Sequence, residues 1–461
     1  MFWQTRTPSE DGKNFLTEDS TTLTYGQAFD QADLLYAGTI RGVALILCDR
    51  NIDTVLAYIG ALRAGHVPLL IDAETKPGAL SRILSEYRPD YLFAPASFEP
   101  SEGWHAHTRT GTSQLWAAAN REDTPLHQNL CLLLPTSGST GDPKTVRLTA
   151  ANVQSCTEEI CRYLSMTPDV RAAALLPLHY SYGLSVLHSV MEARATFVLT
   201  QKSVLDRDFW AFVEEANITD IAGVPFIFEI MRRMKIPDAV MANLRCVTQA
   251  GGRLDPRITK QFVTLFASAD VQYFTMYGQT EAAPRIAYLP PEMAEEKLGA
   301  VGRPLSIGTA CIAETGAPTG EGELLYSGPN VCMGYAQNRA DLAKGDELMG
   351  RLHTGDHVCI DDDGIIHIIG RRARFVKLQG QSVSLDHVES ILKAQDIDCR
   401  AIGRDNLLVI CHTGEAEARI AETLKENFTV HSSSVKIKAV EELSLNSSGK
   451  PDYTALEERF L

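Results

Sequence analysis

The chain of 461 residues has the size of about three domains, or equally of one large domain and a smaller one. Of its residues, 44% are hydrophobic and 22% are charged. This ordinary globular mixture excludes a disordered chain, a collagen-like fibre and a disulfide-stapled miniprotein. Because 58 acidic residues outnumber 43 Lys and Arg residues, the net charge of -15 argues against broad binding to nucleic acid or to an anionic membrane.

The amino terminus and the cysteines favour a cytoplasmic protein. Glu10, Asp11 and Lys13 lie where a secretory signal needs an apolar core, and no segment approaches the ~20 apolar residues of a membrane span. The cysteines are scattered and form no CxxC pair. We therefore expect reduced core thiols and neither a zinc site nor a redox site.

The first half of the chain alternates between buried strands and helices. The apolar run 43–48, the helical pattern 54–64 and the apolar run 67–71 predict a β-α-β unit. A second such unit is expected from strand 171–176, helix 208–215 and strand 220–224. The sequence therefore predicts the α/β class with a parallel or mixed sheet.

After about residue 300 the pattern changes twice. Frequent glycines separate short strands such as 323–327, which predicts a β-rich subdomain. Beyond Gly370 we expect an α+β arrangement of helix 385–394, a hairpin through 405–406, helix 415–427 and strand 435–440. The predicted fold is a large N-terminal domain, residues 1–370, of α/β layers plus the β-rich subdomain, followed by a small C-terminal domain, residues 371–461.

The segment 134–144, with the sequence LPTSGSTGDPK, combines glycines, hydroxyl residues and a lysine after an apolar run. Gly138 and Gly141 allow positive φ, so that backbone N–H groups can turn toward an anion. Hydroxyl and ammonium donors are supplied by Thr136, Ser137, Ser139, Thr140 and Lys144. A polar surface turn is the alternative, whereas a Walker loop is disfavoured because Pro143 stands where its second glycine is required.

This segment resembles the phosphate loop of the AMP-forming, adenylate-forming superfamily, which includes acyl- and aryl-CoA synthetases, peptide-synthetase adenylation domains and firefly-type luciferases. Four further motifs follow in the order of that family. They are YGQTE at 277–281, LHTGD at 352–356, Gly370-Arg371 with Lys377 and Gly380, and SGK at 448–450. Together the motifs extend the resemblance from about residue 20 to the end.

The resemblance implies roles for individual residues. Thr280 would contact the α-phosphate of ATP and Glu281 would hold Mg²⁺, a cation that prefers carboxylate and phosphate oxygens. Asp356 would accept both ribose hydroxyls, and Arg371 would also contact the sugar. The adenine slot is expected from Tyr277, Gly278, Gly251, Gly252 and Arg253. Read alone, the same residues are typical of surface charges, a tight turn and aromatic core packing.

Two lysines are implied for two half-reactions. Lys450 would bridge the carboxylate and the α-phosphate and neutralise charge during adenylation. Lys377 would face the site only after the small, mobile C-terminal domain turns about a hinge just past Gly370, for thioester formation. Without the motifs, both residues would be interpreted as solvated lysines.

The segment 177–184, PLHYSYGL, resembles the family segment that lines the acyl pocket, with Tyr180 at an aromatic gate position. Because 178–183 contains no acid to pair with a buried ammonium, an α-amino acid substrate is disfavoured. The expected pocket residues are His179, Tyr180, Tyr182, Gly183, Phe226, Met276, Ala282 and Ala283. They imply an apolar or aromatic carboxylic acid, although each is also compatible with core packing.

Three features depart from the family pattern. Ala373 stands at a hinge position that is usually Asp or Lys, and Ser382 stands where many members have arginine. The chain is also short for the family, which puts part of the CoA surface in doubt.

The sequence predicts an ATP- and Mg²⁺-dependent ligase that adenylates a small carboxylic acid and transfers the acyl group to a thiol. CoA is favoured as the thiol, with the phosphopantetheine arm of an acyl carrier protein or an amine as alternative acceptors. No nucleic acid and no membrane partner is expected. A non-catalytic nucleotide- or acyl-binding module is the alternative of another class, and the joint presence of Lys144, Glu281, Asp356 and Lys450 argues against it.

Overall fold

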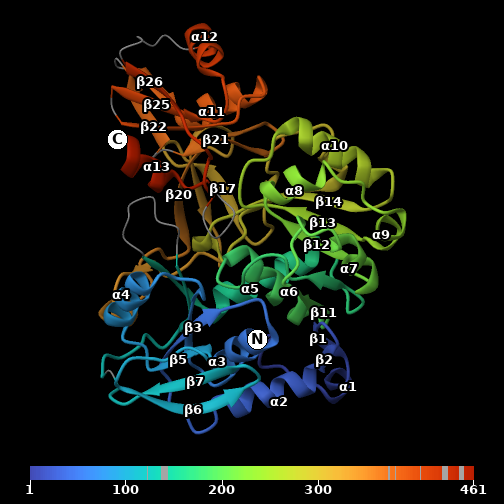
Figure 1. Cartoon of the computed structure of the whole chain (residues 1–461), viewed down its shortest axis with the longest axis vertical. Helices are drawn as coiled ribbons and strands as arrows, with labels where there is room; N and C mark the ends of the chain where they lie inside the picture. Colours follow the sequence, from blue (N-terminus) through green and yellow to red (C-terminus); the bar gives the residue numbers. More distant parts are fainter. Residues whose placement is uncertain are drawn as a thin grey trace. The chain divides into compact units, whose positions relative to one another are not determined.

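The computed structural model describes residues 1–121, 123–135, 144–371, 374–378, 381–404, 406–427, 434–445 and 451–461 (Figure 1). The described residues form two compact units. The first comprises 1–135, 144–309 and 327–352, and the second comprises 310–326 and 353–461. Among the helices of the described residues, none combines the length and the apolar character needed to span a bilayer.

One mixed sheet of the first unit has the strand order β16-β15-β14-β13-β12-β10-β11-β1-β2. Its strands are β1 (Asn14–Glu18), β2 (Thr21–Thr24), β10 (Arg171–Ala173), β11 (Thr196–Leu199), β12 (Asp220–Gly223), β13 (Cys246–Gln249), β14 (Gln272–Tyr277), β15 (Ala287–Leu289) and β16 (Arg303–Pro304). Within this sheet, the neighbouring strands β14, β13, β12, β10, β11 and β1 pair in parallel. The edge strands β2, β15 and β16 pair antiparallel. The central strands β11, β12 and β13 are buried along their whole length, as expected for a parallel sheet that is covered on both faces.

The second sheet of this unit has the order β19-β9-β8-β4-β3-β5-β7-β6. Its strands are β3 (Val43–Cys48), β4 (Val67–Asp72), β5 (Tyr91–Pro95), β6 (Trp104–Thr110), β7 (Ser113–Ala118), β8 (Leu130–Pro135), β9 (Thr145–Thr149) and β19 (Tyr335–Ala336). β3 pairs in parallel with β4 and β5, while β8 and β9 form an antiparallel pair on either side of the predicted phosphate loop.

Helices cover these sheets and complete the core. They are α1 (Pro8–Asp11), α2 (Tyr25–Leu35), α3 (Ile52–Arg63), α4 (Pro77–Tyr87), α5 (Ala150–Tyr163), α6 (Ser181–Ala193), α7 (Phe209–Glu215), α8 (Pro225–Met231), α9 (Asp238–Asn243) and α10 (Pro256–Ala267). The main apolar cluster joins α2, α3, α5 and α6 to both sheets, and α4 packs on a second cluster at the other sheet face. In Figure 1, α8 and α10 flank β12 to β14.

The second unit begins with the sheet β17-β18-β20-β21. Its elements are β17 (Thr309–Ile312), β18 (Gly320–Ser327), β20 (Arg351–Ile360), β21 (Ile366–Arg371), the hairpin β22 (Phe375–Leu378) and β23 (Gln381–Ser384), α11 (Leu385–Ala394), β24 (Cys399–Arg404), β25 (Leu407–His412), α12 (Glu417–Asn427), β26 (Val435–Ala439) and α13 (Tyr453–Phe460). β25 pairs antiparallel with β24 and in parallel with β26, and α11 packs its apolar face on their core.

The predicted elements are confirmed, with differences at their ends. The helix expected from 54 begins at Ile52, because the Asn51 side chain accepts a hydrogen bond from the Thr54 N–H group and caps the helix. The strand expected to reach residue 176 ends at Ala173, where the chain leaves the sheet. All ten cysteines lie among the described residues and are free thiols. The division at residue 370 stays a prediction.

Candidate functional site

The YGQTE motif forms a tight turn at the end of a central strand. β14 ends at Tyr277, which is half-buried, and the 3-10 helix η1 (Thr280–Ala282) follows. The turn needs glycine at 278, because a Cβ atom there would lie 1.7 Å from the Pro284 carbonyl oxygen. Thr280 and Glu281 are therefore presented by a loop that folds closely back on itself.

Glu281 is held by a tyrosine that also contacts Lys144. Tyr335 Oη donates a hydrogen bond to Glu281 Oε1 at 2.9 Å, and the Cys332 N–H group donates to the Glu281 carbonyl oxygen at 2.8 Å. Lys144 Nζ lies 3.9 Å from the centroid of the Tyr335 ring. Burial raises the pKa of Tyr335, so its hydroxyl stays protonated and donating at neutral pH. Tyr335 thus contacts both predicted residues. Its ring faces Lys144, the predicted phosphate ligand, and its hydroxyl binds Glu281, the predicted metal ligand.

This arrangement fits a magnesium ion that accompanies a nucleotide. Mg²⁺ is commonly bound through one or two carboxylates, with phosphate oxygens and water completing the octahedron. Within the described ranges, no group of three or more His, Cys, Asp and Glu side chains could enclose a metal. A cation at Glu281 would therefore take further ligands from phosphate and water.

The predicted acyl segment touches this turn. α6 begins at Ser181, and Ser181 Oγ lies 3.1 Å from Thr280 Oγ1. Gly183 permits the tight entry into the helix, because a Cβ atom there would lie 2.3 Å from the Pro177 carbonyl oxygen. Tyr182 points into the core and donates to the Thr248 carbonyl oxygen at 3.0 Å. The residue predicted to contact the α-phosphate and the predicted acyl segment are thus direct neighbours.

The glycine turn after β13 packs on the predicted aromatic gate. Gly251 has φ +84°, and a Cβ atom there would lie 2.4 Å from Tyr180 Oη. The Gln249 side chain donates to the Gly252 carbonyl oxygen at 2.9 Å, whereas Arg253 is exposed. Burial raises the pKa of Tyr180 to about 12. The turn predicted for the adenine slot and the gate predicted for the acyl pocket therefore meet at one contact.

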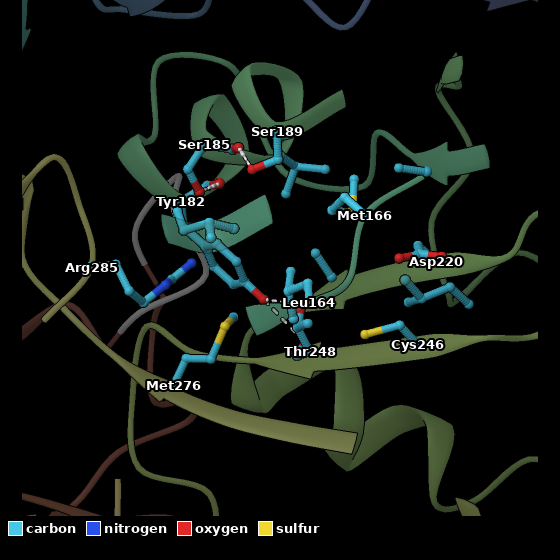
Figure 2. Close-up of a pocket in the computed structure, with 15 residues that line it drawn as sticks. Leu164, Met166, Tyr182, Ser185, Ser189, Asp220, Cys246, Thr248, Met276 and Arg285 are labelled. Atoms are coloured by element: carbon cyan, nitrogen blue, oxygen red, sulfur yellow. Dashed lines mark hydrogen bonds between the residues drawn. The ribbon is translucent and has the colours of Figure 1, made fainter. Parts of the chain in front are cut away.

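A cavity of about 40 Å³ lies beneath α6, bounded by α5 and by β10 and β12 to β14 (Figure 2). Among the expected pocket residues, Tyr182 and Met276 line it. The other expected residues, which lie outside its lining, are His179, Tyr180, Gly183, Phe226, Ala282 and Ala283. Arg285 also lines the cavity and was missed from the sequence. A lone arginine inside the apolar run AAPRIAYL is the signal that could have identified it.

His179 has a separate environment. Its Nε2 atom lies 3.7 Å from Asp72 Oδ2, and neither ring nitrogen has a hydrogen-bond partner among the described residues. Burial lowers the pKa of His179, while the Asp72 carboxylate opposes this shift. His179 is therefore neutral at pH 7.

In the second unit, the two predicted ribose residues face each other across a strand pair. Asp356 on β20 is opposite Arg371 on β21, and Arg371 Nε lies 3.2 Å from Asp356 Oδ1. Asp356 is buried, while the Arg371 side chain is largely exposed. The Arg371 N–H group donates to Asp386 Oδ2 at 3.0 Å, which ties the end of β21 to α11.

A half-buried ionic cluster follows the predicted hinge. Arg374 Nη2 lies 2.6 Å from Glu389 Oε1, and the Arg374 guanidinium carbon lies 3.7 Å from the centroid of the Tyr453 ring. Tyr453 Oη in turn donates to Glu389 Oε2 at 2.9 Å. Because Tyr453 begins α13, this cluster anchors the helix that follows the SGK motif.

Several predicted site residues lie outside the described part of the chain. They are Thr136, Ser137, Gly138, Ser139, Thr140, Gly141 and Lys450. The hinge residue Ala373 is also outside it. Lys377 lies in β22 opposite Ser382, and the description does not extend to its side chain. The roles of these residues stay predictions.

In this fold, the turn around Glu281 places the predicted phosphate motif beside a small cavity. Residues 3–336 match the family described as AMP-binding enzyme. The chain belongs to this family, which confirms the resemblance noted in the sequence.

Two similar proteins align with most of the chain. The 2-succinylbenzoate–CoA ligase of Bacillus subtilis (strain 168) is 24% identical, over 94% of this chain and 93% of that protein. The oxalate–CoA ligase of Arabidopsis thaliana is 27% identical, over 72% of this chain and 67% of that protein.

The solved structure of o-succinylbenzoate CoA synthetase from Bacillus subtilis, in complex with its acyl-adenylate intermediate, has the same fold. It superposes with a TM-score of 0.77 and 21% identity, and covers 96% of this chain and 95% of that one. The predicted α/β fold class is confirmed, as is the class of AMP-forming carboxylate–thiol ligases. The same Bacillus subtilis synthetase has also been solved in complex with ATP and a magnesium ion.

Proposed function

We propose that this protein joins a small carboxylic acid to CoA in two steps. In the first, a carboxylate oxygen attacks the α-phosphorus of ATP, and an acyl adenylate forms as pyrophosphate leaves. In the second, the CoA thiol attacks the acyl carbon, a thioester forms, and AMP leaves. The contact between Ser181 and Thr280 carries this proposal, because it sets the phosphate motif directly beside the acyl segment.

The first step needs positive charge and hydrogen-bond donors where two anions meet. We assign the β- and γ-phosphates to the loop 136–141 and Lys144, and the α-phosphate to Thr280. Glu281, oriented by Tyr335, would hold Mg²⁺, which supplies charge neutralisation on the phosphates when bound. Lys450 would bridge the carboxylate and the α-phosphate.

The nucleoside and the second step involve the remaining predicted residues. We assign the ribose hydroxyls to Asp356, with Arg371 beside it as the ion pair supports. The adenine slot is assigned to Tyr277, Gly278 and the turn 251–253. Lys377 is assigned to thioester formation, with residues 371–461 acting as the predicted mobile domain. A cytoplasmic location stays a prediction.

The substrate class is suggested by the relatives. Oxalate and 2-succinylbenzoate, which name two of them, each carry two carboxylate groups. We propose that the acid used by this protein lies between these two acids in size. CoA is the proposed acceptor, since both relatives are CoA ligases. The phosphopantetheine of a carrier protein and amines are the alternative acceptors, and the assay below distinguishes them.

An ATP–pyrophosphate exchange assay with a panel of paired acids tests this function. Each diacid is paired with a monoacid that lacks one carboxylate, such as glutarate with pentanoate and 2-succinylbenzoate with 3-benzoylpropionate. Products formed with CoA, a phosphopantetheinylated carrier protein or an amine are identified by mass. Exchange with an acid followed by acyl-CoA supports the proposal, whereas ATP binding without exchange for any acid would support a non-catalytic module.

The variant Lys450→Ala separates the half-reactions. We expect it to abolish adenylate formation while still converting a supplied acyl adenylate to the thioester. An adenylation rate near that of the wild type would show that Lys450 has been wrongly assigned.

A further inference from the structure

The cavity beneath α6 contains a charge that an apolar acyl pocket does not explain. Its lining is mainly apolar and comes from α5, α6 and the central strands. Two charged side chains also line it, Arg285 and Asp220. Figure 2 shows them on opposite sides of the pocket, with the Tyr182 ring next to Arg285.

Arg285 is buried and has no anionic partner among the described residues. It is 2% exposed, its Nε donates to Tyr163 Oη at 3.2 Å, and its guanidinium carbon lies 5.1 Å from the centroid of the Tyr182 ring. Within the part of the chain that the structure describes, the guanidinium has no other hydrogen bond and no ion pair. Because arginine stays protonated in proteins, a positive charge is held inside the protein by neutral aromatic groups.

Other buried arginines of this unit are paired with carboxylates. Arg339 Nη1 lies 2.9 Å from Asp90 Oδ2, and Arg194 Nε lies 3.0 Å from Glu10 Oε2. Asp220 does not neutralise Arg285, because its carboxylate already pairs with Arg245, whose Nε lies 3.1 Å from Asp220 Oδ1. A buried charge without a counter-ion is costly, so the exception at Arg285 indicates that its anion comes from outside the described residues, as a bound ligand would.

The loop that carries Arg285 also contains the YGQTE motif, with Thr280 and Glu281. Thr280 contacts Ser181, and Arg285 lies against the next residue of α6, Tyr182. Asn330 donates from Nδ2 to the carbonyl oxygens of Ala282 and Arg285, both at 2.8 Å, and fixes the loop between them. An acyl group that starts at Thr280 and follows the first turn of α6 therefore points toward the guanidinium.

We propose that Arg285 binds a second carboxylate of the acid substrate, so that the enzyme activates dicarboxylic acids. This inference rests on the proposed ligase function and narrows its substrate class. A guanidinium presents a planar fork of N–H donors that matches a carboxylate in two parallel hydrogen bonds. The cavity of about 40 Å³ holds roughly three water-sized atoms, which corresponds to a terminal carboxylate group and is too small for an aromatic ring.

The paired acids test this inference through kcat/KM for pyrophosphate exchange. In the wild type, we expect each accepted diacid to exceed its matched monoacid by about 100-fold, since a site built around a polar partner rejects the analogue that lacks it. In Arg285→Met, which keeps the length and removes the charge, this ratio should fall to about one, mainly through KM for the diacid. Arg285→Lys should retain part of the preference.

Arg194→Met is the matched control, because it removes another buried arginine of the same unit that does not line the cavity. It should leave the ratio of diacid to monoacid unchanged. Equal kcat/KM for both acids in the wild type, or an equal loss for both in Arg285→Met, overturns the inference while the ligase function stands. Absence of exchange with every acid in the wild type overturns the ligase function itself. If Arg285→Met does not fold, the wild-type ratio and Arg285→Lys decide.

Discussion

Asn330 holds the loop that follows the YGQTE motif and carries Arg285. Its side chain is fully buried, and the single Nδ2 atom bridges two carbonyl oxygens at either end of 282–285. Between them, Ala283 has φ +57°, a left-handed conformation that is unfavourable for a residue with a Cβ atom. We predict that Asn330→Ala releases this loop.

The cost follows from the contacts that are lost. Two hydrogen bonds contribute about 1 kcal/mol each, and a buried carbonyl left without a donor costs about 1–3 kcal/mol. The Ala282 carbonyl keeps a second donor, the Arg285 N–H group at 3.0 Å, so that only the Arg285 carbonyl is left unpaired among the described contacts. The expected destabilisation is therefore about 3–5 kcal/mol.

Differential scanning fluorimetry and pyrophosphate exchange measure the two consequences. At about 2 °C per kcal/mol for a large unit, the melting temperature should fall by roughly 6–10 °C. Adenylation should fall by more than about tenfold even below the melting temperature, because Thr280 and Glu281 share the released loop. Asn120→Ala, at an exposed site, is the control and should change neither. Melting of Asn330→Ala within about 1 °C of the wild type would refute the reasoning.

Three further changes test other parts of the structure. Tyr335→Phe removes the donor to Glu281, and the half-saturating Mg²⁺ concentration for adenylation should rise about tenfold. Gly251→Ala should cost about 1–2 kcal/mol of stability for its positive φ and, by displacing Tyr180, raise KM for the acid. Burial lowers the pKa of His66 to about 4, so below pH 6.5 the unfolded chain binds this proton more readily than the folded chain. Between pH 7 and pH 5 His66 should therefore contribute about 2 kcal/mol to the fall in unfolding free energy, and His66→Gln should make the fall smaller by that amount.

A specific result would contradict each of these three predictions. An unchanged Mg²⁺ requirement in Tyr335→Phe would show that the Tyr335 hydroxyl does not orient Glu281 for metal binding. A KM for the acid that is unchanged in Gly251→Ala would show that Tyr180 does not line the acyl pocket. His107→Gln, at an exposed histidine, should leave the pH dependence as in the wild type, and equal slopes for the wild type and His66→Gln would show that another group titrates.

The local elements were predictable because their signals are local. The strand predicted at 43–48 is β3 with the same bounds, and the helix predicted at 385–394 is α11. Apolar runs and helical periodicity record which faces are buried, whatever they pack against. Element ends were less predictable where a side-chain cap decided them, as Asn51 did for α3.

The candidate site was predicted in its parts but not in its contacts. Lys144 and Glu281 were recognised from separate motifs, and their common partner Tyr335 was not recognised, since it lies in neither motif. The acyl pocket was predicted as apolar because the nearby residues Met276, Ala282 and Ala283 are. Arg285 would ordinarily be assigned to the surface, and only the packing of α5 and α6 on the central strands buries it.

By itself, the sequence determined the α/β class, the order of the motifs and the adenylate-forming chemistry they imply, because each depends on residues close together in the chain. Only the tertiary structure decided that Glu281 shares Tyr335 with Lys144 and that Arg285 is a buried cation without a carboxylate partner among the described residues. Burial and pairing depend on residues far apart in sequence, which approach each other only when the sheets and helices pack.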